Sequence, residues 1–157
     1  MKNLLHITLQ QRKVLHGILI GTPREVLLGI PEGYNNNIWW NVAHVVVTQQ
    51  LLVYGLSKLP KHIDEELVQK YRKGTVPDGT ATVGEIEKIK GLLLLTIEKT
   101  LEDYQNGLFK EYKEYTTSTK TTLRNIDDAL AFNLYHEGLH MGTIRSLTKA
   151  HTKADVS

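Results

Sequence analysis

Three of the seven histidines in this 157-residue sequence lie where their imidazole rings could share one metal ion. His136 and His140 are four residues apart, so on a helix they project from one face, one turn from each other. His44 belongs to a distant segment, in which residues spaced by three or four form one stripe: Asn37, Trp40, His44, Val47 and Leu51. If the two segments are facing helices, three neutral nitrogen ligands meet and leave one coordination direction open, which is typical of catalytic metal sites.

If these three rings are buried, their nitrogen atoms need hydrogen-bond partners even where no metal binds. An unpaired polar group inside a helix bundle costs roughly 1–3 kcal/mol, so a hydrogen-bonded cluster of histidines is the alternative to a metal site. The other four histidines lie on polar faces or in polar segments, and we expect them in solvent: His6, His16, His62 and His151.

Four more side chains lie on or beside the two histidine stripes: Asn37, Trp40, Asn41 and Asn133. They are candidates for binding a substrate or for hydrogen bonding to the outer ring nitrogens, which need partners to fix the tautomers of metal ligands. Asn37 could instead only cap a helix. For Trp40 we favour a place in the core over a place in a pocket wall.

The segment from His136 to His140 also matches the H-E-x-x-H motif of zinc peptidases, in which the glutamate is the general base. The extended motif requires a third histidine six residues past the second, where this chain has Ser146, and little chain remains for a downstream ligand. A peptidase also normally needs an edge strand to bind an extended substrate, and we expect no sheet in this protein. Glu137 points about 100° away from His136 on a helix, so it is a weak catalytic candidate and could equally be a solvated acid.

The elements that must position these residues are four long helices, predicted from apolar residues at intervals of three and four. We expect them at about residues 3–20, 38–55, 82–106 and 125–150. The first should bury a stripe of Leu4, Ile7, Val14, Leu15 and Ile18 and end at a left-handed Gly21.

The connections between these helices differ in length. We predict a short helical turn after Pro23 that ends near Gly29, and a loop at residues 116–119. Between the second and third long helices we predict a long crossover with one short helical piece around residues 64–71. The fold class is therefore all-α, a four-helix bundle with a long crossover between helices 2 and 3. Residues 1–150 form its single domain, and residues 151–157 form a polar C-terminal tail.

The composition excludes several classes of function. The net charge is only +2, which is not the basic balance expected of a nucleic-acid-binding domain. Because there is no cysteine, disulfides and thiolate metal ligands are excluded. No run of about 18 apolar residues could span a membrane, and polar residues interrupt residues 1–21 too often for a signal peptide. We therefore expect a soluble cytoplasmic protein.

Two segments resemble those of a known family. The run Asn35–His44, with tryptophan shortly before histidine, and the run His136–Gly142 are similar to the second-helix and fourth-helix motifs of the DinB-like superfamily. The resemblance implies a four-helix bundle of the DinB/YfiT-like type, with His44, His136 and His140 holding a divalent ion, zinc or nickel. It also implies that Gly142 lets the last helix pack closely. Thr143 departs from the glutamine that often follows this glycine.

The resemblance implies two chemistries on a small-molecule substrate. Members of the family include bacillithiol-type thiol S-transferases and presumed metal-dependent hydrolases, so the ion would activate a low-molecular-weight thiol or water. Any thiol must arrive as a cosubstrate, because this chain has no cysteine. The family also implies a possible homodimer. The alternative to an enzyme is a non-catalytic binding or dimerising helical module with a vestigial histidine cluster.

Overall fold

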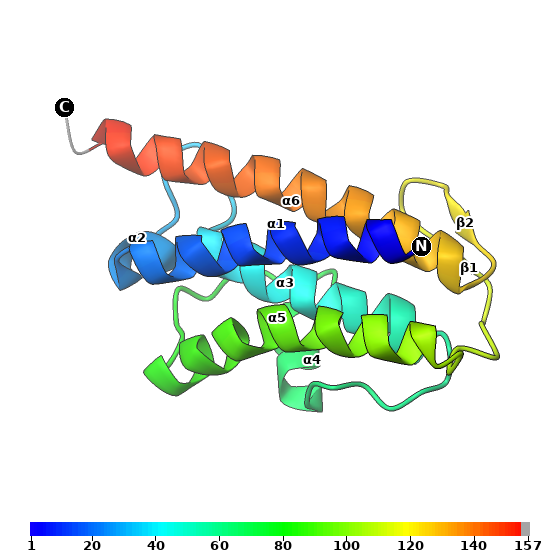
Figure 1. The fold of residues 1–157 in the computed structure, drawn as a ribbon. Coiled ribbons are helices and arrows are strands. Elements are labelled where there is room, and N and C mark those ends of the chain that lie inside the picture. The colour runs from blue at the N-terminus through cyan, green and yellow to red at the C-terminus, as the bar shows by residue number, and fades with distance from the viewer. Residues whose placement is uncertain (155–157) are drawn as a thin grey trace.

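The computed structural model describes residues 1–154, which are almost entirely helical (Figure 1). The four long helices are α1 (Lys2–Gly21), α3 (Ile38–Gln50), α5 (Val83–Gln105) and α6 (Ile126–Ala154). The short ones are α2 (Arg24–Leu28), α4 (Glu65–Tyr71) and a π-helical turn that continues α3, η1 (Leu51–Gly55). The all-α class predicted from the hydrophobic periodicity is confirmed.

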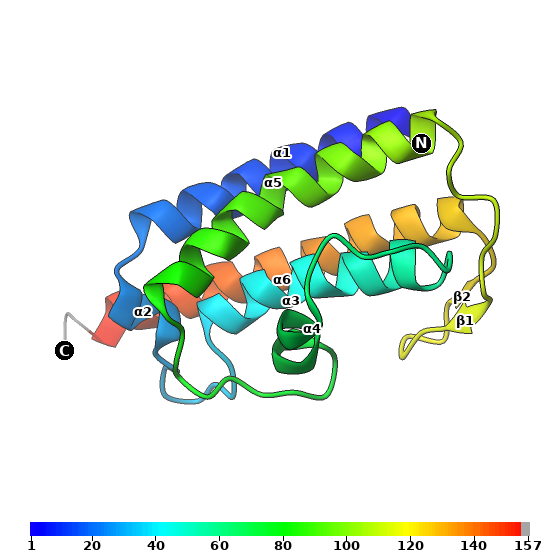
Figure 2. The same ribbon diagram turned by 90° about the horizontal axis from the view of Figure 1, so that it is seen from below.

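The long helices run alongside one another, as two views at right angles show (Figures 1 and 2). α1 contacts α5 and α6, and α3 contacts the same two helices. α3 is the most deeply enclosed element, because twelve of its thirteen residues are buried. Within residues 1–154, none of the helices combines the length and the apolar character that spanning a membrane would require.

Side-chain caps explain where the helices begin. Asn37, Asp64 and Thr82 each accept a hydrogen bond from the backbone N–H three residues later, and so does Asn125 at the start of α6. The C-terminal ends follow two rules. Gly107 adopts a φ of +64° after α5, as expected of a glycine that ends a helix. The prediction that Gly21 does the same is wrong, because α1 includes Gly21 and ends at an extended Thr22 before proline.

The buried face of α1 differs from the predicted stripe. The structure buries Leu5, Thr8, Arg12, Leu15 and Leu19. Two residues of the predicted stripe, Ile7 and Val14, are 52% and 48% exposed. The prediction failed because it left Arg12 out of the buried stripe, whereas the structure buries this residue and pairs its charge inside the protein. A buried arginine in the middle of the true stripe makes that stripe look polar in the sequence.

The connection between α5 and α6 contains a small hairpin, which the sequence analysis did not predict. Strands β1 (Tyr115–Thr116) and β2 (Thr122–Leu123) pair antiparallel, with Thr116 opposite Thr122. The expectation of no sheet at all is therefore wrong for this segment. Threonine is β-branched and suits an extended backbone, so a threonine-rich stretch can form a short ladder as readily as a loop.

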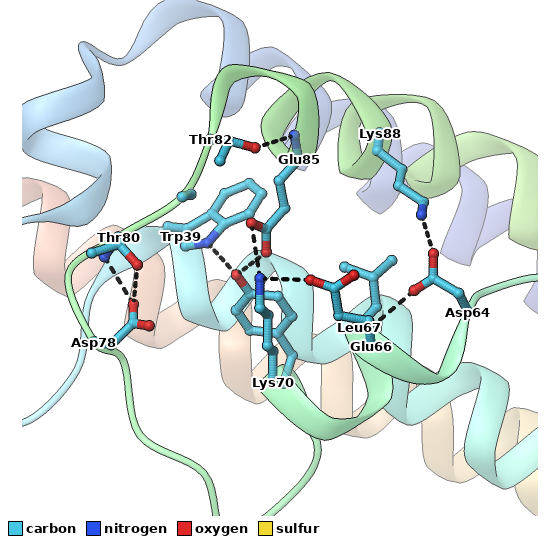
Figure 3. Close-up of polar contacts among 12 residues, drawn as sticks. Trp39, Asp64, Glu66, Leu67, Lys70, Asp78, Thr80, Thr82, Glu85 and Lys88 are labelled. Carbon is cyan, nitrogen blue, oxygen red and sulfur yellow. Dashed lines mark hydrogen bonds and ion pairs between the residues drawn. The ribbon is translucent and has the colours of Figure 1, made fainter.

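The long crossover between η1 and α5 contains α4, as predicted, and polar contacts tie it to both neighbours (Figure 3). The indole N–H of Trp39 on α3 donates to the hydroxyl of Tyr71, which donates to Glu85 on α5. Lys70 pairs with the same Glu85, and Lys88 pairs with the capping Asp64. This network holds the C-terminal end of α4 against α3, where the candidate site lies.

Two further predictions concern α6: the polar C-terminal tail and the close packing at Gly142. This helix extends through Ala154, into the segment predicted as a polar tail, and the last three residues of the tail lie outside the described residues. Gly142 is exposed, and a Cβ added there would meet no atom within 4 Å. The close helix packing expected at Gly142 is therefore wrong, because its face of α6 is turned to open space.

Candidate metal centre

α3 carries His44 into the interior two turns after its asparagine cap. The ring is only 5% exposed, and Trp40 stacks on it with centroids 4.4 Å apart and planes 13° from parallel. Its Nδ1 lies 2.7 Å from the backbone carbonyl oxygen of Tyr71, the last residue of α4. A carbonyl can only accept, so Nδ1 carries the hydrogen and Nε2 carries the lone pair. α4 thus determines the tautomer of His44.

α6 supplies His136 and His140 from consecutive turns. The Nδ1 of His140 lies 2.7 Å from Oδ1 of Asn41 on α3. Because the amide nitrogen of Asn41 donates to Asn36 and to the carbonyl oxygen of Asn37, the Asn41 oxygen is the acceptor. Nδ1 of His140 therefore donates, and its Nε2 carries a lone pair. This Nε2 is 3.1 Å from Nε2 of His136.

The three rings converge, as the spacing of the histidines predicts. The ring centroid of His44 is 5.2 Å from that of His136 and 4.8 Å from that of His140, and the two rings of α6 are 4.5 Å apart. One possible ligand atom from each ring lies within 4.8 Å of the other two. Neutral ring nitrogens that face each other this closely need a shared proton or a shared cation. The donor set fits a divalent ion such as zinc or nickel, both of which accept imidazole nitrogen.

Burial keeps the three rings uncharged at neutral pH. It lowers the pKa of His44 below the ordinary value. Burial also lowers the pKa of His136 to about 3 and that of His140 to about 4, and repulsion from neighbouring histidines acts in the same direction. Only an unprotonated ring can bind a metal, so these nitrogens remain available without competition from protons at pH 7.

A cavity of about 550 Å³ opens onto the three histidines. Apolar side chains form much of its wall: Leu51, Leu52, Leu56, Phe132 and Leu139. Hydroxyl groups contribute most of the polar part: Thr48, Tyr115, Thr117, Ser118, Thr119 and Tyr135. Such a volume and such walls are typical of sites for small molecules.

Thr48 is a residue of this site that the sequence analysis missed. Its hydroxyl lies 3.2 Å from Nε2 of His44, at the edge of the cavity. The signal was present, because Thr48 is one helical turn after His44 and so shares its face. Tyr71 was also missed, and no sequence pattern could have found it, since its contribution is a backbone carbonyl from another helix.

Glu137 contacts α1 and does not line the cavity. Arg12 on α1 forms a bidentate pair with it, with Nε–Oε2 and Nη2–Oε1 distances of 2.8 and 2.9 Å. Asn133 donates to Oε1 as well, at 2.7 Å, and Arg12 also donates to the carbonyl oxygen of Val45 on α3. Both oxygens of Glu137 are thus engaged, and its side chain is buried rather than solvated. The pair joins α1, α3 and α6 directly behind the histidines.

The predicted substrate-binding candidates Asn37, Trp40, Asn41 and Asn133 are all buried. Asn37 caps α3 with its oxygen and donates to the carbonyl oxygen of Leu28 with its amide nitrogen. Trp40 belongs to the hydrophobic core, and its N–H donates to Thr75. Neither lines the cavity at the histidines, although both line a smaller cavity of about 240 Å³ beside α4. Asn41 alone of the four candidates contacts a histidine by a hydrogen bond.

The four other histidines are apart from the site. His6 and His62 are exposed, as predicted, whereas His16 and His151 are half-buried against neighbouring helices and loops. His62 lies beside Asp103, with a nitrogen–oxygen distance of 3.6 Å. None of the four belongs to the group of residues in the described chain that could hold a metal.

Comparison with known proteins agrees with this geometry. The model of one family, the DinB superfamily, matches residues 7–144, which include all three histidines of the cluster and all four long helices at least in part. A search of curated proteins found no match. The match covers far more than half of the chain, and its ends fall inside α1 and α6. This protein therefore belongs to the DinB superfamily.

Proposed function

We propose that this protein is a cytoplasmic, metal-dependent enzyme that acts on a small molecule, as a thiol S-transferase or as a hydrolase. His44, His136 and His140 would hold the ion, zinc or nickel. The observation that carries the proposal is the orientation of His44 and His140, whose Nδ1 atoms are engaged by Tyr71 and Asn41, so that both Nε2 atoms carry lone pairs. The groups nearest to these two atoms are the Thr48 hydroxyl and Nε2 of His136. One possible ligand atom from each of the three rings lies within 4.8 Å of the other two, so one ion can be shared among them.

A bound divalent ion supplies positive charge that stabilises the anionic form of a thiol or of water beside it. The chain's own residues do the rest. Asn41 and the carbonyl of Tyr71 hold two rings in the tautomers that leave Nε2 unprotonated. The apolar wall excludes bulk water from the substrate, which strengthens electrostatic interactions there. Thr48 offers a hydroxyl at the cavity edge that can orient a substrate group.

We assign Glu137 a positioning role in place of the catalytic role considered from the sequence. Its two oxygens already accept three hydrogen bonds from Arg12 and Asn133, and the residue does not line the cavity. Asn133, one turn earlier on α6, donates to the same carboxylate and so supports the ion pair of Glu137 with Arg12. We also infer that α1, α3, α5 and α6 form a four-helix bundle of the DinB/YfiT-like type, because each long helix contacts two others lengthwise.

Metal content tests the proposal directly. We expect protein purified without chelator or affinity tag to contain close to one equivalent of zinc or nickel by elemental analysis. His44→Ala and His140→Ala should lose it, because each removes one of three ligands. His6→Ala is the matched control, since His6 is exposed on α1 and should leave the content unchanged. Wild-type protein that binds neither metal in excess would refute the site.

Turnover distinguishes an enzyme from a binding module. Metal-loaded protein should be assayed with low-molecular-weight thiols plus electrophiles, and separately with simple esters and amides. Product formation that disappears in His140→Ala supports the enzyme, whereas full metal content without any turnover favours the non-catalytic module. The homodimer stays a prediction, which light scattering checks: a monomer at high concentration would contradict it.

A further inference from the structure

We propose that the ligand of the cavity is an amphipathic anion, an apolar molecule with a carboxylate or similar group that pairs with Lys73. This inference deepens the proposed function and rests on it, because it names the class of substrate that the same site takes. It follows from the distribution of apolar surface, of hydroxyl groups and of charge around the cavity.

The apolar wall is continuous with the histidines. Phe132 lies one turn before His136 on α6, with ring centroids 6.3 Å apart and planes at 24°. Tyr135 and Leu139 follow on the same helix, and both line the cavity and are 51% exposed. Large side chains left open to water at a cavity lose that exposure when an apolar ligand covers them. The body of the ligand is therefore apolar.

Lys73 is the one lysine among the residues that line the cavity, and no arginine lines it. No carboxylate lines the cavity, and Lys73 forms no ion pair or hydrogen bond with any residue of the described chain. Lys70, one turn earlier, differs in this respect because Glu66 and Glu85 both pair with it. A lone ammonium group beside an apolar wall is complementary to an anion and repels a cation.

The position of Lys73 connects this charge to the metal centre. It lies two residues after Tyr71, whose carbonyl oxygen holds His44. The hairpin turn adds hydroxyl groups from Thr117, Ser118 and Thr119 to the cavity wall. A ligand can therefore place its anionic group at Lys73 and its apolar body along α6 while a further group reaches the histidines.

Fluorescence titration of the full chain with two probes tests this inference. The probes are 1-anilinonaphthalene-8-sulfonate, an aromatic anion, and N-phenyl-1-naphthylamine, which is similar but neutral. Lys73→Met removes the charge and keeps an apolar stem. It should therefore lower the affinity for the anionic probe about three- to fivefold, which is the contribution of one partly exposed ion pair. Lys73→Glu should weaken it more, and neither variant should change the affinity for the neutral probe more than about twofold.

Two controls complete the experiment. Lys13→Met makes the same change in net charge on an exposed residue of α1 outside the cavity wall, and both probes should bind it as they bind the wild type. Leu139→Gln should lower the affinity for both probes, because it places a polar side chain in the apolar wall. Equal affinity of wild type and Lys73→Met for the anionic probe would overturn the inference, as would insensitivity of both probes to Leu139→Gln. The titration contains EDTA, so its outcome does not depend on whether the metal proposal succeeds.

Discussion

On one side of α6, His136 and His140 face a cavity, and their Nε2 atoms are 3.1 Å apart. On the other side, Glu137 faces α1, and Arg12 and Asn133 donate to both of its oxygens. The first group is partly exposed and uncharged, and the second is fully buried and charged. Both place polar groups inside the protein, but neighbouring side chains pair both carboxylate oxygens of Glu137. Among the described residues, Nδ1 of His136 on the first side has no hydrogen-bond partner, and on the second side neither has Nη1 of Arg12 nor Oδ1 of Asn133.

This difference separates a polar group that stabilises the fold from one that is ready to bind. A buried carboxylate must be paired, because an uncompensated charge in the interior is strongly unfavourable. Neutral imidazoles tolerate unfilled lone pairs more easily, in particular where a cavity admits solvent or a ligand. The sharpest tests of the comparison change one side of α6 and leave the other intact.

The largest effect is expected from Glu137→Ala, which leaves Arg12 buried without its partner. Breaking a buried ion pair costs about 3–5 kcal/mol, so the free energy of unfolding in urea should fall by that amount. The double variant Arg12→Met, Glu137→Leu should recover most of the loss, because it removes both charges together. His140→Ala in metal-free protein should cost only about 1 kcal/mol. A Glu137→Ala protein as stable as the wild type would remove the distinction between the two sides.

The second effect is on the pH dependence of stability in metal-free protein. The pKa of His136 is lowered to about 3 and that of His140 to about 4, so the unfolded chain takes up protons first as the pH falls. Stability is therefore unaffected above the ordinary histidine pKa of about 6.5 and decreases below it, by roughly 1–2 kcal/mol per ring at pH 5.

Urea unfolding at pH 7.5 and at pH 5.0 measures this difference. The double variant His136→Gln, His140→Gln should lose less stability between the two pH values than the wild type does. His6→Gln is the control, because His6 is exposed and its removal should leave the pH dependence unchanged. Identical pH dependence in the wild type and the double variant would show that the rings are not held uncharged by the fold.

The smallest effect is expected from changes at Asn41, which joins α3 to His140 on α6 by a hydrogen bond. Asn41→Ala removes the acceptor for Nδ1 of His140 and should weaken metal binding about 10- to 100-fold, as loss of such partners does in other metal sites. Asn41→Asp keeps an acceptor oxygen and should retain most of the affinity. Competition with a chromophoric chelator gives both values. Equal metal affinity in Asn41→Ala and wild type would mean that Asn41 only joins the helices.

Local patterns were enough to place the long helices and the three histidines. Asn37, Thr82 and Asn125 cap helices by contacts within three residues, so their effect is visible in the sequence. The spacing of His136 and His140 determines their common face for the same reason. Asn41 was correctly placed among the candidates for binding a ring nitrogen, although the sequence did not distinguish it from Asn37 or Asn133.

The prediction failed where a residue depends on a distant partner. Arg12 was left out of the predicted core stripe of α1, because its partner Glu137 is 125 residues away in the sequence. The hairpin after α5 was missed because threonine-rich segments suit both loops and strands.

By itself the sequence determined the helical class, the caps and which histidines share a face, since these depend on the few residues next to each position. Only the tertiary structure decided that Tyr71 orients His44, that Arg12 neutralises Glu137 and that a largely apolar cavity with Lys73 in its wall lies beside the three rings. The physical reason is that each of these contacts joins different helices or connections. The energy of such a contact exists only after the chain has closed the loop between its two partners.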